Sequence, residues 1–204
     1  MIGEGVFSVW LALAAAAAGY LCGNLQTSLL ISRLYYHDDI RRHGSGNAGS
    51  TNMVRVFGFK PGILTFAGDF LKAVAGVLLG RLIMGPLGGF IAALFVVVGH
   101  CWPAFAGFRG GKGVASTFGA AVMIFPLGGL IGIAVGGLML AIFKKVSLMS
   151  LCGVLAFLIS VLIFRLSELP LVILSALLTL IVYIRHIDNI RRLLRREEKP
   201  LRNS

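Results

Sequence analysis

The sequence predicts an all-α polytopic membrane protein, a helix bundle of about seven transmembrane segments with its N-terminus outside and its C-terminus in the cytoplasm. The chain is 57% hydrophobic and only 13% charged, and its mean hydropathy is +0.91. Several uncharged runs approach the roughly 20 residues that a helix needs to cross a bilayer core. We therefore expect residues 1–204 to form one integral membrane domain with a basic cytoplasmic tail over 185–204.

The apolar runs place the expected helices near residues 5–32, 61–84, 86–105, 115–143, 147–164 and 169–184. The first run ends in an alanine tract that could imitate a signal-peptide cleavage site. However, the first ten residues contain Glu4 and no Lys or Arg, so the positive region of a signal peptide is absent. We interpret this run as the first transmembrane helix.

The positions of the cations orient the bundle, because Lys and Arg accumulate in cytoplasmic loops. Sixteen of the 19 cations lie within 33–60, 109–112, 144–145 and 185–202, and we assign these segments to the cytoplasm. The run 115–143 joins two such segments, so we expect it to cross twice, as two short helices or a re-entrant hairpin broken near Phe125-Pro126. The alternative is one long tilted span that leaves Lys144-Lys145 outside.

The net charge of +11 could indicate nucleic-acid binding. The long uncharged runs do not suit a basic nucleic-acid-binding protein, so no nucleic-acid partner is expected. Basic loops facing anionic lipid headgroups explain the charge. The cysteines, Cys22, Cys101 and Cys152, lie in apolar sequence without metal-ligand spacing, and we interpret them as small core residues.

Two glycine-bearing loops, 44–55 and 107–113, lie between apolar runs on the same predicted side of the membrane. Such loops expose backbone N–H groups, and a cation accompanies each loop, which favours phosphate binding. The second loop is not a Walker A motif, because Ala106 and Gly113 stand where that motif needs Gly and Ser or Thr. The alternative interpretations are a flexible cytoplasmic turn and a polar helix cap.

The first loop combines hydroxyl, amide and guanidinium groups, which suit phosphate and polyol recognition. These groups belong to Ser45, Asn47, Ser50, Thr51, Asn52 and Arg55, with Gly46 among them.

Polar residues also occur outside the two loops. His186 and Asn189 share one helical face beyond the last span, although a basic helix on anionic lipid is the alternative there. Asp69 and Lys72 lie three residues apart within one expected span, where we expect an inward-facing charge pair near the site. Ser150 lies at a cytoplasmic helix edge and is equally consistent with a helix cap.

Several common catalytic patterns are absent from the sequence. There is no Cys/His spacing typical of a metal site and no Gly-x-Ser-x-Gly nucleophile elbow. The His-x4-Asp pair of the common acyl-CoA-type glycerolipid acyltransferases is also absent. No metal or other cofactor is expected.

At its polar motifs the chain resembles the bacterial integral-membrane acyl-phosphate:glycerol-3-phosphate acyltransferases. Residues 44–55 match the first motif of that family, Gly-Ser-Gly-Asn-x-Gly-x-Thr-Asn-x-x-Arg. Residues 99–103 and 110–115 match the second motif, and 147–150 with 186–193 resemble the third region and the tail. The resemblance runs over nearly the whole chain.

The resemblance implies a seven-helix enzyme of the bacterial inner (cytoplasmic) membrane, with its active site facing the cytoplasm. Such an enzyme transfers a fatty acyl group from acyl phosphate to the 1-hydroxyl of glycerol 3-phosphate, giving lysophosphatidic acid and phosphate in phospholipid biosynthesis. Its partners would be these two substrates and membrane lipid, with no cofactor. Arg196 and Ala73 depart from the family by replacing usual glycines. We make no prediction of acyl-chain preference or oligomeric state.

The resemblance also implies roles for individual residues. The predicted catalytic residues are Ser45, Arg55, Lys112, His186 and Asn189. The predicted substrate-binding residues are Gly46, Asn47, Thr51, Asn52, His100, Gly110, Gly111, Gly113 and Ser150. Which loop binds which phosphate stays open.

Acyl phosphate is already activated, so positioning and electrostatics could carry the reaction without a covalent intermediate. The general base is either His186 or the phosphate of glycerol 3-phosphate, which titrates near pH 6. A phosphate-ester transporter is the alternative function. It would be expected to show an inverted repeat, and we find none in the sequence.

Overall fold

The computed structural model describes residues 2–198, and this part of the chain forms helices and loops without any β-strand. The helices are α1 (Ile2–Asn24), α2 (Thr27–Tyr36), α3 (Ser50–Phe57), α4 (Phe59–Cys101), α5 (Val114–Ile124), α6 (Pro126–Phe143), α7 (Val146–Phe164), α8 (Leu169–Arg185) and α9 (Ile187–Leu194). Two 3₁₀ turns, η1 (Ile40–Arg42) and η2 (Ala104–Ala106), lie in the loops. The predicted all-α fold is confirmed, while the tail cations Lys199 and Arg202 fall outside the described residues.

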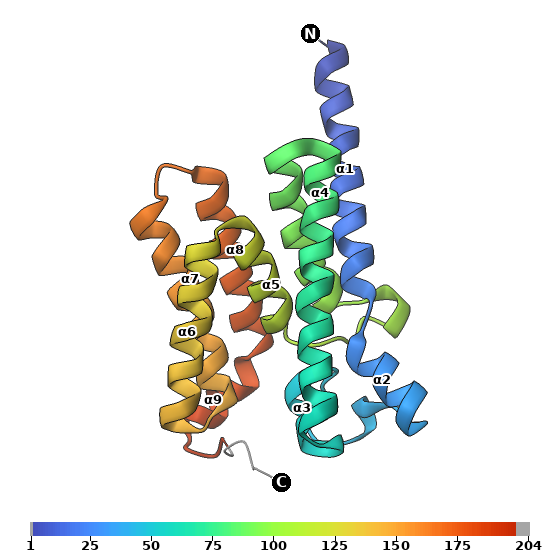
Figure 1. Ribbon diagram of the computed structural model, residues 1–204, viewed down its shortest axis with the longest axis vertical. Coiled ribbons are helices and arrows are strands. Elements are labelled where there is room, and N and C mark those ends of the chain that lie inside the picture. Colours follow the sequence, from blue (N-terminus) through green and yellow to red (C-terminus); the bar gives the residue numbers. More distant parts are fainter. Residues whose placement is uncertain (1, 199–204) are drawn as a thin grey trace.

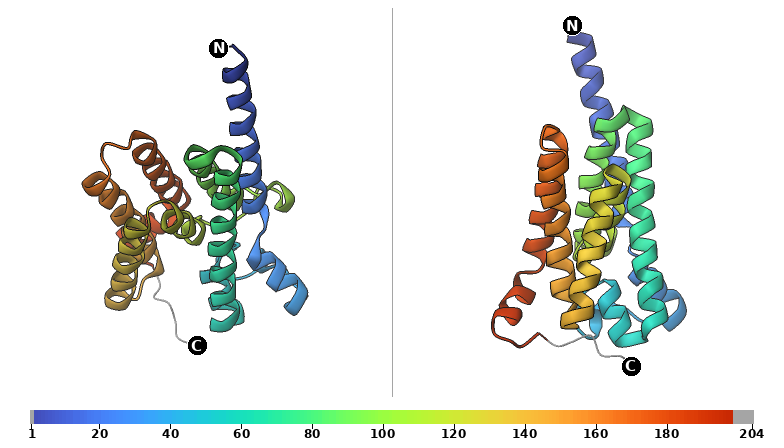
Figure 2. Two further views of the ribbon diagram at one scale, coloured as in Figure 1. Left: turned by 45° about the horizontal axis from the view of Figure 1, so that its top comes forward. Right: turned by 60° about the vertical axis from the view of Figure 1, so that its left-hand side comes forward.

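The long helices run roughly along one axis of the molecule (Figure 1). The short helices α2, α3 and α9 gather at one end of the bundle, opposite the N-terminus (Figure 1), and the right-hand view of Figure 2 agrees. Because these elements carry or adjoin the predicted polar motifs, the candidate site residues gather at this end of the bundle.

The first apolar run is not one helix. We expected a helix over 5–32, but α1 ends at Asn24 and α2 starts at Thr27. The break frees the backbone carbonyl of Leu25, which accepts a hydrogen bond from the Lys72 ammonium at 2.6 Å. Gln26 stabilises the same break by donating to the carbonyl of His100 at 3.2 Å. The helix is interrupted because a buried cation needs acceptors that an intact helix cannot offer.

Helix α4 is a hairpin of two antiparallel arms. The backbone leaves helical geometry at Met84 and at Gly85, whose φ is 62°, and Figure 1 shows the chain turning back there. The two arms approach so closely that a Cβ on Gly80 would lie 2.3 Å from the Gly88 carbonyl oxygen. The turn confirms the two helices expected over 61–84 and 86–105, although the second ends earlier, at Cys101.

The run 115–143 is likewise two helices, as expected. Helix α5 ends at Ile124, Phe125 leaves helical geometry, and Pro126 opens α6. The chain reverses between them (Figure 1), so Lys112 and Lys144 lie towards the same end. However, α5 has only 11 residues, about 16 Å of helix, which is too short to cross a bilayer core alone.

Four helices of the described chain are long and apolar enough to cross a membrane, or five if the bent α8–α9 pair counts as one span. This count treats the two arms of α4 as one segment. The seven crossings and the orientation of the termini therefore stay predictions.

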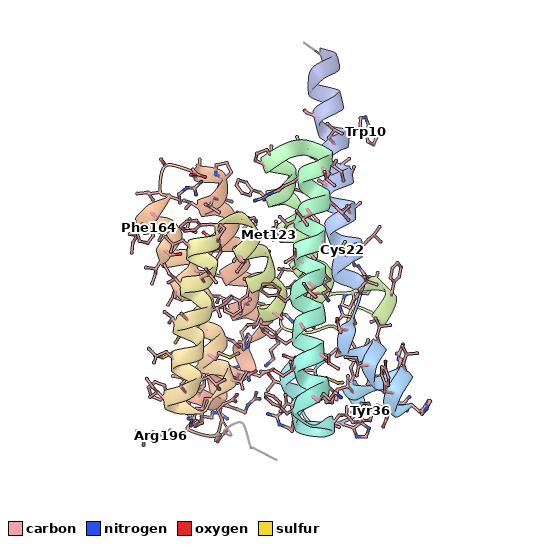
Figure 3. All side chains as sticks on the ribbon, viewed as in Figure 1. Trp10, Cys22, Tyr36, Met123, Phe164 and Arg196 are labelled. Carbon is pink, nitrogen blue, oxygen red and sulfur yellow. The ribbon has the colours of Figure 1, made fainter. Side chains whose placement is uncertain are left out.

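The core lies where α4, α5, α7 and α8 meet, and Val96, Ala120, Phe157 and Leu178 are fully buried there. The outer surface is also apolar. Trp10 and Phe164 are prominent examples (Figure 3). An apolar exterior around a packed core is the arrangement expected for helices in lipid.

Candidate active site

A cavity of about 610 Å³ opens at the end of the bundle that carries α3 and α9. Residues far apart in sequence form its wall: the first loop, the start of α5, the start of α7 and the α8–α9 junction. Twelve of the fourteen predicted site residues line it: Ser45, Gly46, Asn47, Thr51, Asn52, Arg55, His100, Lys112, Gly113, Ser150, His186 and Asn189. Gly110 and Gly111 do not.

Asn52 organises the first loop from within. Its side chain is 1% exposed, and its carbonyl oxygen accepts from the Ser45 N–H at 2.9 Å. Its amide group donates to the carbonyls of Ile40, His43 and Asn47 at 3.0–3.2 Å. The hydrogen-bonding capacity of Asn52 is thus used by backbone groups of residues 40–47, which indicates a scaffolding role rather than the predicted substrate contact.

Three other first-loop residues leave polar groups available to a ligand. Ser45 and Thr51 line the cavity, and neither hydroxyl has a hydrogen-bond partner among residues 2–198. Arg55, on the last turn of α3, also lines the cavity and has no ion-pair partner in that range. A guanidinium with free donors beside two hydroxyls suits a bidentate contact with phosphate.

Arg41, on η1 just before the first loop, contacts the segment that leads into the second loop. Its guanidinium pairs with Asp39 at 2.7 Å and donates to the carbonyl of Ala106 at 2.7 Å. The turn before the first loop is thereby fastened to η2, directly before the second loop.

Gly110 and Gly111 correct part of the prediction, because their N–H groups are not free to hold phosphate. The Gly110 N–H donates to the carbonyl of Cys101 at 3.3 Å, and that of Gly111 donates to His100 at 3.1 Å. Their own carbonyls accept from Arg185, at 3.1–3.3 Å. These two glycines shape the loop, and Lys112 is the residue of this loop that can offer a cation to phosphate.

Arg185 is a site residue that the sequence prediction missed. It lines the cavity, binds both glycine carbonyls and lies over the Trp102 ring at 5.5 Å from the centroid. It therefore clamps the second loop onto the end of α8. A cation directly before His186 was visible in the sequence, but nothing there indicated its contact with the loop.

Lys112 and Gly113 lie at the start of α5, whose first turn faces the cavity. A helix N-terminus attracts anions, and the ammonium adds a full charge. Burial, together with the charges of Arg192 and Arg185, lowers the pKa of Lys112 to about 8. The environment is thus rich in positive charge and partly shielded from water.

Asn189 connects Lys112 with the C-terminal segment. Its side-chain oxygen accepts from Lys112, and its amide nitrogen donates to Ser147 at 2.6 Å and to Glu198 at 3.0 Å. Glu198 also accepts from Ser147 and from Arg192 at 2.9 Å. Hydrogen bonds from Ser147, Arg192 and Asn189 outweigh burial and lower the pKa of the Glu198 carboxyl.

Glu198 and Ser147 are further site residues that the prediction did not include. The contacts of both depend on how α7, α9 and the tail fold together.

His186 lies in the bend between α8 and α9 and is 3% exposed. Its Nδ1 lies 2.8 Å from the carbonyl of Val182, so Nδ1 carries the proton and Nε2 is an acceptor when the ring is neutral. Burial, with the nearby charge of Lys112, lowers the pKa of His186 to about 4. His186 is therefore a neutral ring at physiological pH.

Ser150 lies in the cavity wall, but its hydroxyl donates to the carbonyl of Val146 at 2.9 Å, within α7.

The predicted inward pair of Asp69 and Lys72 is confirmed, with 2.8 Å between the charged atoms. Among residues 2–198 no group of three or more His, Cys, Asp or Glu side chains is arranged to hold a metal ion.

The helical bundle and its cationic cavity define an integral membrane protein with a site suited to phosphorylated ligands. The chain belongs to the glycerol-3-phosphate acyltransferase family, whose sequence model matches residues 13–196. It is 40% identical to a glycerol-3-phosphate acyltransferase of Thermoanaerobacter sp. (strain X514), over 93% of this chain and 96% of the relative. It is also 40% identical to the Clostridioides difficile (strain 630) enzyme of the same description, over 91% of this chain and 93% of the relative.

Two crystal structures have the same fold. They are the glycerol 3-phosphate form and the lysophosphatidic acid form of PlsY, an integral membrane glycerol 3-phosphate acyltransferase. The TM-scores are 0.87 and 0.82, each at 30% identity and covering 93% of this chain and 94% of the other. The family suggested by the sequence motifs is thereby confirmed.

Proposed function

We propose that this protein transfers a fatty acyl group from acyl phosphate to the 1-hydroxyl of glycerol 3-phosphate, at the cytoplasmic face of a bacterial inner membrane. The products are lysophosphatidic acid and phosphate. The observation that carries the proposal is one cavity, at one end of a membrane bundle, with cationic groups from several separate elements in its wall. Arg55 comes from α3, Lys112 precedes α5, Arg185 ends α8 and Arg192 lies on α9.

The acceptor and product follow from the relatives. The PlsY structures are described as glycerol 3-phosphate and lysophosphatidic acid forms, and this chain shares their fold and family. For the acyl donor we propose acyl phosphate. Several cations in one cavity suit two phosphate-bearing reactants, and acyl phosphate already carries a good leaving group. The apolar residues Phe66, Val146 and Met149 in the cavity wall suit an acyl chain entering from lipid.

In the proposed reaction the 1-hydroxyl oxygen attacks the acyl carbonyl carbon. A carbon–oxygen bond forms, the bond to the phosphate oxygen breaks, and the hydroxyl proton leaves to a base. Lys112 and Arg55 stabilise the phosphate charges, and hydroxyls such as Ser45 can orient the reacting groups. His186 would orient glycerol 3-phosphate, whereas Asn189 would act through Lys112, whose ammonium donates to its side-chain oxygen.

The low pKa of His186 favours the substrate phosphate over this residue as the base. The Nε2 of His186 can accept a hydrogen bond, but a pKa of about 4 makes it a weak proton acceptor. A phosphate monoester, with a pKa near 6, is more basic. His186 then acts as a neutral acceptor for a substrate hydroxyl.

The test uses purified protein in detergent with acyl phosphate and glycerol 3-phosphate. We expect phosphate release and lysophosphatidic acid formation that require both substrates, and no product when acyl-CoA or acyl carrier protein replaces the donor. Product from acyl-CoA alone would refute the proposed donor, and no product from any donor would refute the activity. A transporter would release no phosphate in detergent.

A further inference from the structure

A buried ionic cluster adjoins the cavity, formed by Asp69 and Lys72 on the first arm of α4 and His100 at the end of the second arm. The three residues are 2%, 7% and 3% exposed. The proposed reaction gives the pair Asp69 and Lys72 no role. Buried charges in a membrane bundle are costly unless paired, and they often mark function.

The Lys72 ammonium has three partners. It lies 2.8 Å from the Asp69 carboxylate, 2.6 Å from the carbonyl oxygen of Leu25 and 2.9 Å from Nδ1 of His100. An ammonium has three donors and no acceptor, so these three contacts use it completely. Asp69 is held in turn by the Thr27 hydroxyl at 3.1 Å.

This arrangement fixes the protonation state of His100. Because the ammonium can only donate, Nδ1 of His100 must accept and cannot carry a proton. The Asp69 carboxylate lies 3.6 Å from the same Nδ1, too far for a good hydrogen bond. The proton of the neutral ring is therefore on Nε2.

The Nε2 side of His100 lies against the second loop. His100 lines the cavity, and a Cβ added to Gly111 would lie only 2.1 Å from its Nε2. The backbone of the residue before Lys112 thus lies against the imidazole. Contacts that hold the orientation and tautomer of the His100 ring therefore also hold a hydrogen-bond donor beside the second loop.

We propose that Lys72, supported by Asp69, is a positioning residue that locks His100 in its neutral Nε2–H form, so that the ring presents a hydrogen-bond donor to the acyl-transfer cavity. The inference rests on the proposed function for the use of that donor. The fixed tautomer of His100 itself depends only on the contacts within the fold. In the reaction, an uncharged donor at this point can stabilise negative charge that develops on a substrate oxygen.

The first test is spectroscopic and needs no activity. Protein labelled with ¹⁵N-histidine is measured by NMR, and the His100 signals are assigned by their loss in His100→Gln. We expect an unprotonated Nδ1 and a protonated Nε2 in the wild-type protein. A protonated Nδ1, or a mixture of tautomers, overturns the proposal.

The second test compares two replacements of His100. The side-chain nitrogen of Gln can take the place of Nε2, whereas the Asn side chain reaches only the position of Nδ1. His100→Gln should keep turnover within about threefold of wild type, because a neutral donor remains. His100→Asn should lower kcat by about 100-fold, the usual cost of one such donor. Equal loss in both variants contradicts a donor role.

The third test separates positioning from general stability. Asp69→Leu/Lys72→Met removes both charges together, which avoids an unpaired buried ion. We expect kcat to fall about tenfold or more with KM little changed, because the donor is mispositioned. The same double change in a His100→Gln background should cost almost nothing, since no tautomer is left to fix.

If the double change costs the same in both backgrounds, Lys72 is structural and the proposal fails. If the double variant does not fold, the NMR measurement on wild-type protein still tests the proposed tautomer of His100. The failure of the proposed function is a separate outcome, because wild-type protein would then lack turnover with acyl phosphate while the His100 signals are unaffected.

Discussion

The ammonium of Lys112 donates a hydrogen bond to the side-chain oxygen of Asn189, 77 residues further along the chain. The other end of this amide faces the Glu198 carboxylate, at 3.0 Å. A cation on one side and an anion on the other leave the amide only one favourable orientation. Asn189 therefore joins the start of α5 to α9 and the tail, and it holds the charge of Lys112 at the cavity wall.

The titration of Lys112 should make activity fall at alkaline pH. Burial first, and then Arg192 and Arg185, lower its pKa from the ordinary value of 10.5 to about 8, while Glu198 and Asp188 act in the opposite direction. Arg55, from α3, and the neutral His186 also face the cavity. Lys112 is charged below about pH 8 and neutral above it, so kcat/KM should fall as the pH rises through about 8.

A pH profile of kcat/KM checks this prediction, with Lys112→Arg as the matched variant. Arg stays protonated over the whole working range, so the variant should lose the fall near pH 8 even if its overall activity is lower. An unchanged fall in Lys112→Arg would assign it to another group.

Much of the fold could be predicted from the sequence, because it depends on local pattern. The break at Phe125 and Pro126, the separate arms of α4 and the inward Asp69–Lys72 pair follow from proline, hydrophobic length and the cost of charge in lipid. The break after Asn24 could not be predicted in this way, because it depends on a lysine that lies far along the chain.

The composition of the site was also predictable, but the task of each polar group was not. Asn52 stands among ligand-type residues, yet its amide donates to the carbonyls of Ile40, His43 and Asn47. Gly110 and Gly111 have the pattern of a phosphate loop, but their N–H groups pair with the end of α4. Such hydrogen bonds arise only when distant segments fold together, so sequence spacing does not reveal them.

Replacing His186 by Gln tests the assignment of the base. The Gln side chain retains an acceptor near the position of Nε2, so we expect kcat within about threefold of wild type and a KM for glycerol 3-phosphate raised by about tenfold. Steady-state kinetics at saturating acyl phosphate measure both. A fall in kcat of about 100-fold or more would instead identify His186 as the base.

Arg185 should not be replaceable by Lys, although both residues are cations. The Arg185 guanidinium donates to both glycine carbonyls, and a single ammonium cannot copy this planar fork. We expect Arg185→Lys to fold but to lose about 10- to 100-fold in kcat/KM, because the loop that carries Lys112 shifts.

Arg191→Lys is the control for the Arg185 variant. Arg191 lies on α9 in a pair with Asp188, and their side chains are 69% and 79% exposed. Such a surface pair contributes little, so its kinetics should match wild type. If Arg185→Lys is equally active, charge alone is sufficient and the clamp has no catalytic importance.

Adding one methyl group at Gly111 should inactivate the enzyme without unfolding the bundle. The new Cβ would lie 2.1 Å from Nε2 of His100 and 3.0 Å from the carbonyl oxygen of Ala48. Neither neighbour can withdraw freely, because His100 is held by Lys72 and the second contact is backbone. The loop must therefore move, and a displacement of about 1 Å can cost about 100-fold in rate.

Gly137→Ala provides the matched comparison, because a Cβ there meets nothing within 4 Å. Gly137 lies inside α6, where Ala is favoured over Gly by about 0.5–1 kcal/mol, so this variant should keep full activity and be slightly more stable. Initial rates, together with thermal unfolding in detergent, measure both variants. If Gly111→Ala keeps wild-type turnover, the second loop has enough freedom to absorb the methyl group, and the close contact between His100 and Gly111 is not required for catalysis.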